Sequence, residues 1–273
     1  MTTTGVWPNN PLVYVLALAR FPLIPSMADF VTAFGNSIGR KYPHRNTHTN
    51  QIATAEFGPD GLRLNTQQQT LWQFRQDDRA RAVLVGPDFI LLHCGKGAYT
   101  NHADFIGELA SLITKLSEIP GIVLTHVTSI GYRYVDLIQP AEDKSLHEYL
   151  QPWAIPSDIP PHVVGDLEIV EGTSVSIFKT SVGMLRFQAH RHPPATLPGD
   201  LDSPFMRENG WVTDRPAEDF VLLDFDHGRQ FVPPMALNVD EFKASMVEVC
   251  QPGRKLFHES IKEFGREVWE APT

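Results

Sequence analysis

Apolar positions near the start of the sequence form one strand-like run and one helix-like stripe. Residues 12–21 are apolar almost throughout, which predicts a strand that is buried on both faces and ends before Pro22. Ser26 is a good N-cap, and the spacing after it predicts a helix that ends near Lys41. The apolar positions of this helix are Met27, Phe30, Val31, Phe34 and Ile38.

The following residues are expected to form short strands joined by turns. Alternating and β-branched residues predict strands over 51–57, 62–65, 70–75 and 81–94. The turn residues Gly86-Pro87-Asp88 are expected to divide the last of these into two. His44 and His48 have the spacing of a metal-binding pair but lack the accompanying Glu, so we expect a loop there.

A second helix and a long strand complete the first half. Asn101 is the expected N-cap of a helix over 102–117, which Pro120 and Gly121 follow. Residues 122–138 are rich in β-branched and aromatic side chains and predict a strand, in which Gly131 indicates a bulge or a bend.

The second half opens on a proline-rich connector and ends on helices. Residues 151–161 hold four prolines, which is typical of a connector because proline fixes φ and lacks an N–H donor. Strands are predicted over 163–170, 174–180, 184–192 and 220–226. A helical segment is expected from Asn238 or Asp240, and Pro252-Gly253 is expected to separate it from a last helix.

The order of these elements predicts an α+β protein with two packed halves. Residues 1–150 are expected to form a split βαβ-like unit, with a mixed or antiparallel sheet and two helices on one face. Residues 151–161 connect this unit to residues 162–273, for which we expect an antiparallel sheet covered by the C-terminal helices.

Charge is distributed unequally between the two halves. The chain of 273 residues has 23 Lys and Arg against 32 Asp and Glu, a net charge of −9 that disfavours generic nucleic-acid binding. Residues 1–150 carry 12 basic and 13 acidic side chains, whereas residues 151–273 carry 11 and 19. The acidic second half is suited to meeting a basic protein partner, although an acidic surface also serves solubility alone.

Cysteine usage and hydropathy favour a cytoplasmic protein. Cys94 and Cys250 lack the CxxC spacing of metal or redox sites and are expected to be buried thiols. The apolar run that starts at Leu12 stops at Arg20, whereas a membrane span needs about 20 apolar residues. We therefore expect neither a signal peptide nor a membrane-spanning helix.

The strongest candidate for a metal centre combines two predicted strands. His190 and His192 alternate along one strand and would share a face, as histidine pairs that bind divalent metals do. An adjacent strand could add Asp224, Asp226 or His227. The alternative is a solvated strand edge with no metal.

A second candidate is the run Tyr132-Arg133-Tyr134 in the long strand. The two tyrosines would share one face, and Arg133 would point to the opposite face. An arginine beside aromatic rings could hold a nucleotide or single-stranded nucleic acid. The alternative is an arginine paired across the sheet with an acid such as Asp136 or Asp166.

Four segments carry a resemblance to a known family. They are residues 11–22, residues 72–90, Ile130-Gly131-Tyr132-Arg133-Tyr134-Val135, and residues 256–261. Together they resemble a family of sporadically distributed prokaryotic proteins, in which the third segment usually reads Gly-Leu-Arg-Tyr, then Ile or Val, then Asn. Here Tyr132 replaces the Leu and Asp136 replaces the Asn. The patchy distribution of that family implies an accessory role, such as defence, toxin–antitoxin or effector–immunity systems.

Three functions follow as hypotheses. Because no complete catalytic motif such as GxSxG occurs, we assign no catalytic residue and no cofactor, and we favour a non-catalytic binding protein with a protein partner. The second is a metal-dependent hydrolase with a divalent ion at the His190 and Asp224 cluster. The third is nucleotide or single-strand binding at Arg133.

Overall fold

The computed structural model describes residues 7–58, 61–95, 97–159, 161–165, 167, 169–201, 206 and 219–270. The strands of the first half are β1 (Leu12–Arg20), β2 (His44–Gly58), β3 (Gly61–Arg75), β4 (Arg81–Val85), β5 (Phe89–Gly95) and β6 (His126–Ile138). The strands of the second half are β7 (Gly172–Lys179), β8 (Met184–Arg191) and β9 (Val221–Ala236).

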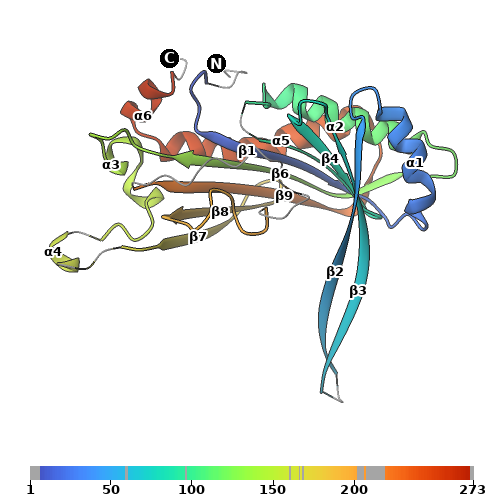
Figure 1. Cartoon of the computed structure of the whole chain (residues 1–273), viewed down its shortest axis with the longest axis horizontal. Coiled ribbons are helices and arrows are strands. Elements are labelled where there is room, and N and C mark those ends of the chain that lie inside the picture. The colour runs from blue at the N-terminus through green and yellow to red at the C-terminus, as the bar shows by residue number, and fades with distance from the viewer. Residues whose placement is uncertain are drawn as a thin grey trace.

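These nine strands form one sheet in the order β2-β3-β4-β5-β1-β6-β9-β8-β7 (Figure 1). Every neighbouring pair is antiparallel. The predicted α+β class is confirmed. The two halves of the chain meet at β6 and β9, which pair from His126 opposite Ala236 to Ile138 opposite Val221, so the sheet continues from one half into the other.

The larger helices cover one face of the sheet (Figure 1). The helices are α1 (Met27–Ile38), α2 (His102–Ser117), α3 (Leu146–Tyr149), α4 (Pro161–Val164), α5 (Val239–Ser260) and α6 (Glu263–Val268), and Pro152–Ala154 form a 3₁₀ turn. Helices α2 and α5 contact each other and lie across the central strands. Alternate residues of the strands face these helices, and the others face the opposite side.

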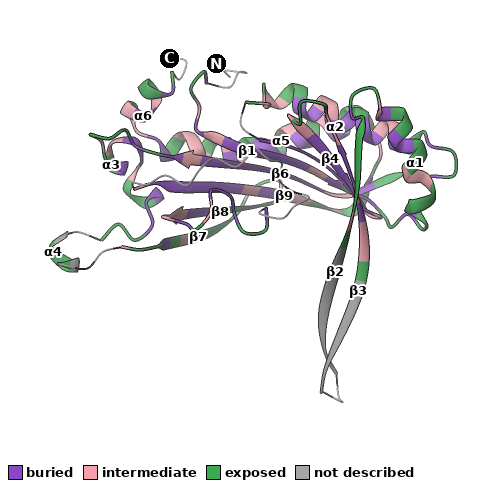
Figure 2. Cartoon of the chain, viewed as in Figure 1, coloured by how far each residue is buried: buried purple, intermediate pink, exposed green. Residues whose placement is uncertain are grey.

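The main core lies between the sheet and the helices. It is built from one side of each central strand, for example Val15 and Ala17 of β1, and from the inner faces of α2 and α5 (Figure 2). A smaller core lies on the other face, where Leu16 and Val135 pack with Leu197 of the segment after β8. The central strands are therefore buried on both faces, which explains their continuous apolar runs.

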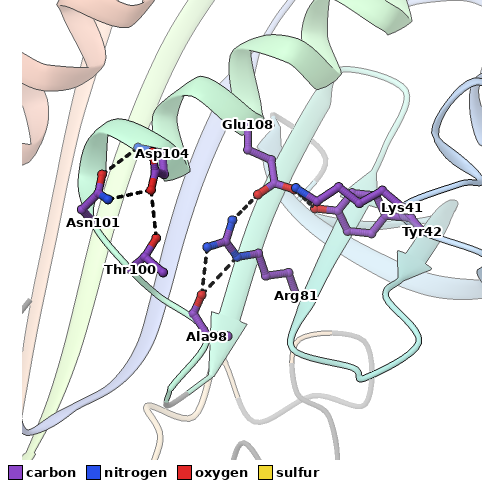
Figure 3. Close-up of polar contacts among 8 residues, drawn as sticks. All are labelled: Lys41, Tyr42, Arg81, Ala98, Thr100, Asn101, Asp104 and Glu108. Atoms are coloured by element: carbon purple, nitrogen blue, oxygen red, sulfur yellow. Dashed lines mark hydrogen bonds and ion pairs between the residues drawn. The ribbon is translucent and has the colours of Figure 1, made fainter.

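An ion-pair network joins α2 to the strands. Glu108 of α2 accepts hydrogen bonds from Arg81 and Tyr42 and pairs with Lys41 (Figure 3). Arg81 also donates to the carbonyl oxygen of Ala98, at 3.1 Å from Nε and 2.9 Å from Nη2. Burial raises the pKa of Glu108, but its hydrogen bonds and the positive charges of Arg81 and Lys41 outweigh burial and lower it.

Several predicted elements are confirmed. Helix α2 begins at His102 as expected, because the Asn101 side chain accepts a hydrogen bond from the Asp104 backbone N–H at 2.8 Å. Residues Gly86-Pro87-Asp88 separate β4 from β5. Asn238 caps α5 by accepting from the backbone N–H groups of its first turn. By contrast, Ser26 precedes α1 without making a side-chain cap.

The predicted loop at His44 and His48 is wrong. Strand β2 begins at His44 and pairs with β3 along its whole length, which merges the short strands predicted over 51–57, 62–65 and 70–75 into one hairpin. This hairpin projects from the body of the molecule (Figure 1). Only Trp72 to Arg75 of β3 also pair with β4.

Two boundaries in the second half are also wrong. The predicted strand over 163–170 is replaced by the short helix α4, and its described residues 165, 167, 169 and 170 belong to no strand. Helix α5 continues through Pro252-Gly253 and ends at Ser260. Gly253 packs closely on Phe225 of β9: a Cβ added to Gly253 would lie 3.4 Å from the Phe225 Cβ. Packing on the sheet therefore keeps the helix continuous across the proline.

Candidate functional site

Arg133 is the centre of a cluster on the face of the sheet opposite α2 and α5. Its Nε and Nη2 donate to the two carboxylate oxygens of Asp224 at 2.8 and 2.7 Å. Its Nη1 and Nη2 donate to Asp200 at 2.5 and 3.0 Å. Arg133 is 6% exposed and Asp224 is 1% exposed. The predicted pairing of Arg133 with an acid is therefore present, but with Asp224 and Asp200.

Neither of the two acids that the sequence suggested as partners of Arg133 is seen to pair with it. Asp136 has the parity of Tyr132 and Tyr134 and lines a cavity on the helix-covered side. Asp166 lies outside the described residues. The partner Asp224 could not be recognised in advance, because the pairing of β6 with β9 brings together residues 91 positions apart.

The charges around Arg133 indicate a structural ion pair, with Asp226 as an additional acid beside it. Burial raises the pKa of Asp200, but hydrogen bonds from Arg133 outweigh burial and lower it. Asp226 lies directly opposite Arg133 across β6 and β9. Burial raises the pKa of Asp226 even though the charge of Arg133 lowers it. Two acids bind the guanidinium in bidentate fashion, so little of its hydrogen-bonding capacity remains for a ligand.

The two tyrosines lie on the other side of the sheet from Arg133. Tyr132 and Tyr134 have ring centroids 4.8 Å apart and pack among Phe105 and Tyr99 under α2. The expected parity of these three residues is confirmed. Arg133 and the tyrosines therefore share no surface on which one base could contact all three.

The fold brings together some of the five residues proposed as a metal centre but not all of them. Strands β8 and β9 are neighbours, as expected, and place His190, Asp224 and Asp226 on one face of the sheet, where the Asp224 charge acts on His190. His190 lies opposite Leu222 and bonds Thr173 Oγ1 at 3.1 Å. His192 follows the end of β8, has a φ of 52°, and pairs with Asp219 at 2.7 Å.

His227 and Asp224 are also engaged elsewhere. His227 faces the helices, where its Nδ1 lies 2.6 Å from the carbonyl oxygen of Val249 and its Nε2 lies 2.9 Å from Thr180 Oγ1. Asp224 is bound to Arg133. In the strand register, Asp226 lies directly opposite Arg133, and it is closer to this arginine than to His190 or His192. Within the described residues, no three His, Cys, Asp or Glu side chains are grouped as metal ligands. The proposed divalent-metal site therefore stays a prediction.

The free edge of β7 is a site that the sequence analysis did not single out. Strand β7 pairs with β8 on one side and with no described strand on the other. Val175 is 49% exposed, Ile177 is 65% exposed and Phe178 is 42% exposed. Alternation had predicted the strand, but alternation does not show whether a strand lies at the edge or in the middle of a sheet.

Exposed apolar residues are concentrated in β7 and in the stretches of sequence directly before and after it. Thirteen large apolar residues are exposed in the described part of the chain, and nine of them lie between positions 153 and 184. They are Trp153, Ile159, Val163, Leu167, Val170, Val175, Ile177, Phe178 and Met184. Such a concentration is typical of an interaction surface, whereas single exposed apolar residues are common.

The sequence matches no protein-family model and no curated protein. The resemblance to the sporadically distributed prokaryotic family therefore stays a prediction.

No helix in the described ranges is both long enough and apolar enough to cross a lipid bilayer.

Proposed function

We propose that the protein is a non-catalytic binding protein that receives an extended segment of a protein partner along the free edge of β7. The observation that carries the proposal is the concentration of exposed apolar side chains between positions 153 and 184 beside an unpaired strand. In this mode of recognition, backbone hydrogen bonds supply affinity and alternate side chains supply specificity.

The composition of β7 supports this role. Sheet edges are usually protected from other chains by charged residues, proline or a bulge. Strand β7 contains no proline, pairs regularly with β8, and has Lys179 as its single charged residue. The opposite edge begins at His44 and Arg45, which are polar and exposed. The β7 edge therefore has the features of a docking edge rather than a protected one.

The charge of the second half favours a basic partner. Residues 151–273 carry eight more acidic than basic side chains. An acidic surface attracts a basic segment over several ångströms and speeds its association. We expect the partner segment to alternate apolar residues with basic ones. Such a partner fits the accessory, defence or immunity-type role that the family resemblance implies.

The test compares two variants that change equally exposed apolar residues. Ile177→Lys places a charge on the β7 edge, whereas Leu23→Lys places one at a residue that is 67% exposed and lies after β1. Tagged wild-type protein and both variants are produced in the native host, and their bound proteins are compared quantitatively. We expect a partner that the wild type and Leu23→Lys recover equally and that Ile177→Lys loses at least tenfold.

Hydrogen exchange of the reconstituted complex locates the contact. We expect backbone amides of β7 to become protected when the partner binds, with little change in β2. The proposal is wrong if all three proteins recover the same set of partners, or if protection falls outside β7. A homodimer that Ile177→Lys dissolves would replace the foreign partner by a second copy of the chain.

A further inference from the structure

A cavity of about 90 Å³ lies on the helix-covered side of the sheet, away from β7. Its walls come from β6, the start of α2, helix α5 and the segment before β1. One water-sized group occupies roughly 10–15 Å³ by this measure, so the cavity has room for a molecule of several non-hydrogen atoms. Trp7 and Phe257, with ring centroids 5.6 Å apart, form part of its apolar wall.

Two buried polar groups in this cavity have no hydrogen-bond partner among the described residues. Asp136 is 4% exposed, and its carboxylate makes no hydrogen bond or ion pair with the described residues. The Tyr134 hydroxyl is buried and makes no hydrogen bond of ordinary geometry in the described part of the chain, although the Tyr99 hydroxyl and the Cys250 thiol lie near it. Buried polar groups are almost always paired, because an unpaired one loses its hydrogen bonds to water without replacement. Both groups indicate a bound ligand that supplies the missing hydrogen bonds.

The charge around Asp136 indicates what that ligand must carry. The charged side chain that acts on Asp136 is Asp224, another acid, and no cation among the described residues pairs with Asp136. Burial, followed by the charge of Asp224, raises the pKa of Asp136 well above its ordinary value. An ammonium group would satisfy the carboxylate, and the surrounding aromatic rings also favour a cation.

The other end of the cavity has the opposite polarity. Arg254 of α5 lines it, with Nη1 3.4 Å from His102 Nδ1 at the first residue of α2. The N-terminus of this sixteen-residue helix carries partial positive charge. Burial, followed by the charge of Arg254, lowers the pKa of His102. A ligand that spans the cavity would therefore place an anionic group at this end.

We propose that the cavity binds a small zwitterion of the amino-acid type, with its ammonium group on Asp136 and its carboxylate toward Arg254 and the start of α2. The Tyr134 hydroxyl supplies a further hydrogen bond near Asp136. The aromatic wall formed by Trp7 and Phe257 packs against the hydrocarbon part of the ligand. This site is independent of partner binding at β7.

The test uses a series of ω-amino acids as molecular rulers. The full chain is titrated by calorimetry with compounds from glycine to 6-aminohexanoate, which differ in the distance between ammonium and carboxylate. An n-alkylamine and an n-alkanoate of each length serve as probes with one charged end only. We expect one chain length to bind best, at least tenfold more tightly than the amine or the carboxylate of the same length.

Variants locate the ammonium end of the ligand. Asp136→Asn keeps the size of the side chain and is expected to weaken binding of the best zwitterion at least tenfold, and Tyr134→Phe to weaken it severalfold. Asp143→Asn, at an acid whose side chain is 82% exposed, is expected to bind as the wild type does. Melting curves verify that each variant is folded.

Three results would overturn the proposal. They are the absence of saturable binding by any amino acid at about 10 mM, equal affinity for the alkanoate and the amino acid, and unchanged affinity in a folded Asp136→Asn variant. None of them bears on the β7 edge, because Ile177 lies outside this cavity.

Discussion

At the scale of single residues, Arg133 is held by the fold rather than presented to a ligand. Its guanidinium pairs with Asp224, which is even more deeply buried, and with Asp200, whose side chain is 64% exposed. The two acids give a net negative cluster beneath the segment after β8. A buried ion pair contributes little net stability compared with apolar residues, but removal of one partner leaves an uncompensated charge in the interior.

Arg133→Met is therefore expected to destabilise the protein by about 3–5 kcal/mol, because Asp224 would be left buried without its cation. Urea denaturation at neutral pH measures the change. Arg186→Met removes an exposed arginine from the same face, and we expect it to cost less than about 0.5 kcal/mol. A folded Arg133→Met variant of wild-type stability would show that the ion pair is not required.

A second prediction at this scale concerns Asp136 and pH. Because burial and the charge of Asp224 raise the pKa of Asp136 in the folded state, the folded protein keeps a proton that the unfolded chain loses above about pH 4. The free energy of unfolding therefore falls as pH rises from the unfolded pKa through the raised folded pKa. This fall is absent in Asp136→Asn, so the variant gains stability relative to the wild type between pH 4 and 8.

Urea denaturation of both proteins at several pH values measures this difference. Many other groups also titrate, and they act on both proteins alike, so the difference isolates Asp136. A constant difference over this range would mean that Asp136 is ionised throughout, which contradicts the expectation.

At the scale of elements, the β2–β3 hairpin is an arm that the sheet supports only at its base. Beyond Trp72, the residues of β3 toward the tip pair with β2 alone. A two-stranded ribbon is marginally stable by itself in water. The arm therefore contributes little to the stability of the body.

Replacement of residues 50–69 by Asn-Gly tests this expectation. Thr49 and Thr70 are cross-strand partners, so a two-residue turn can join them directly. We expect the free energy of unfolding to change by less than about 1 kcal/mol, as measured by urea denaturation. A large loss of stability would show that the outer arm contacts the body.

Local sequence signals predicted those elements whose ends depend on nearby residues. Helix α2 has its own cap and apolar stripe, and the turn at Gly86-Pro87-Asp88 needs no distant contact. Predictions from local sequence were wrong where contacts between distant residues determine the structure. Pro252 would end an isolated helix, but α5 gains more by staying on the sheet at Gly253 than it loses at the proline.

The candidate sites show the same limit. Strand parity predicted that Arg133 and the flanking tyrosines face opposite sides, because alternation is a property of the strand itself. Which acid meets Arg133 depends on strand order, and the exposure of Ile177 depends on β7 being the last strand of the sheet. The unpaired state of Asp136 depends on residues from three other elements. None of these three features can be predicted from the spacing of residues along the sequence.

At the scale of the whole molecule, the two predicted halves share one sheet. Strand β6 is the last strand of the first half, and β9 of the second half pairs with it over its whole length. The main core contains buried residues of α2 from the first half and of α5 from the second, for example Leu109 and Met246. Separation of the halves would expose two long strand edges and this core at once.

We therefore expect residues 1–150 and residues 162–273 to be unable to fold as separate chains. Each fragment would lose the pairing of β6 with β9 and the packing of α5 on α2. Two-dimensional NMR spectra of each fragment are expected to show poor dispersion, and the two together should recover dispersed signals. The intact chain should unfold in one urea transition that circular dichroism and tryptophan fluorescence report alike. A dispersed spectrum from residues 1–150 alone would instead make the first half an independent domain, with β9 as an addition to its edge.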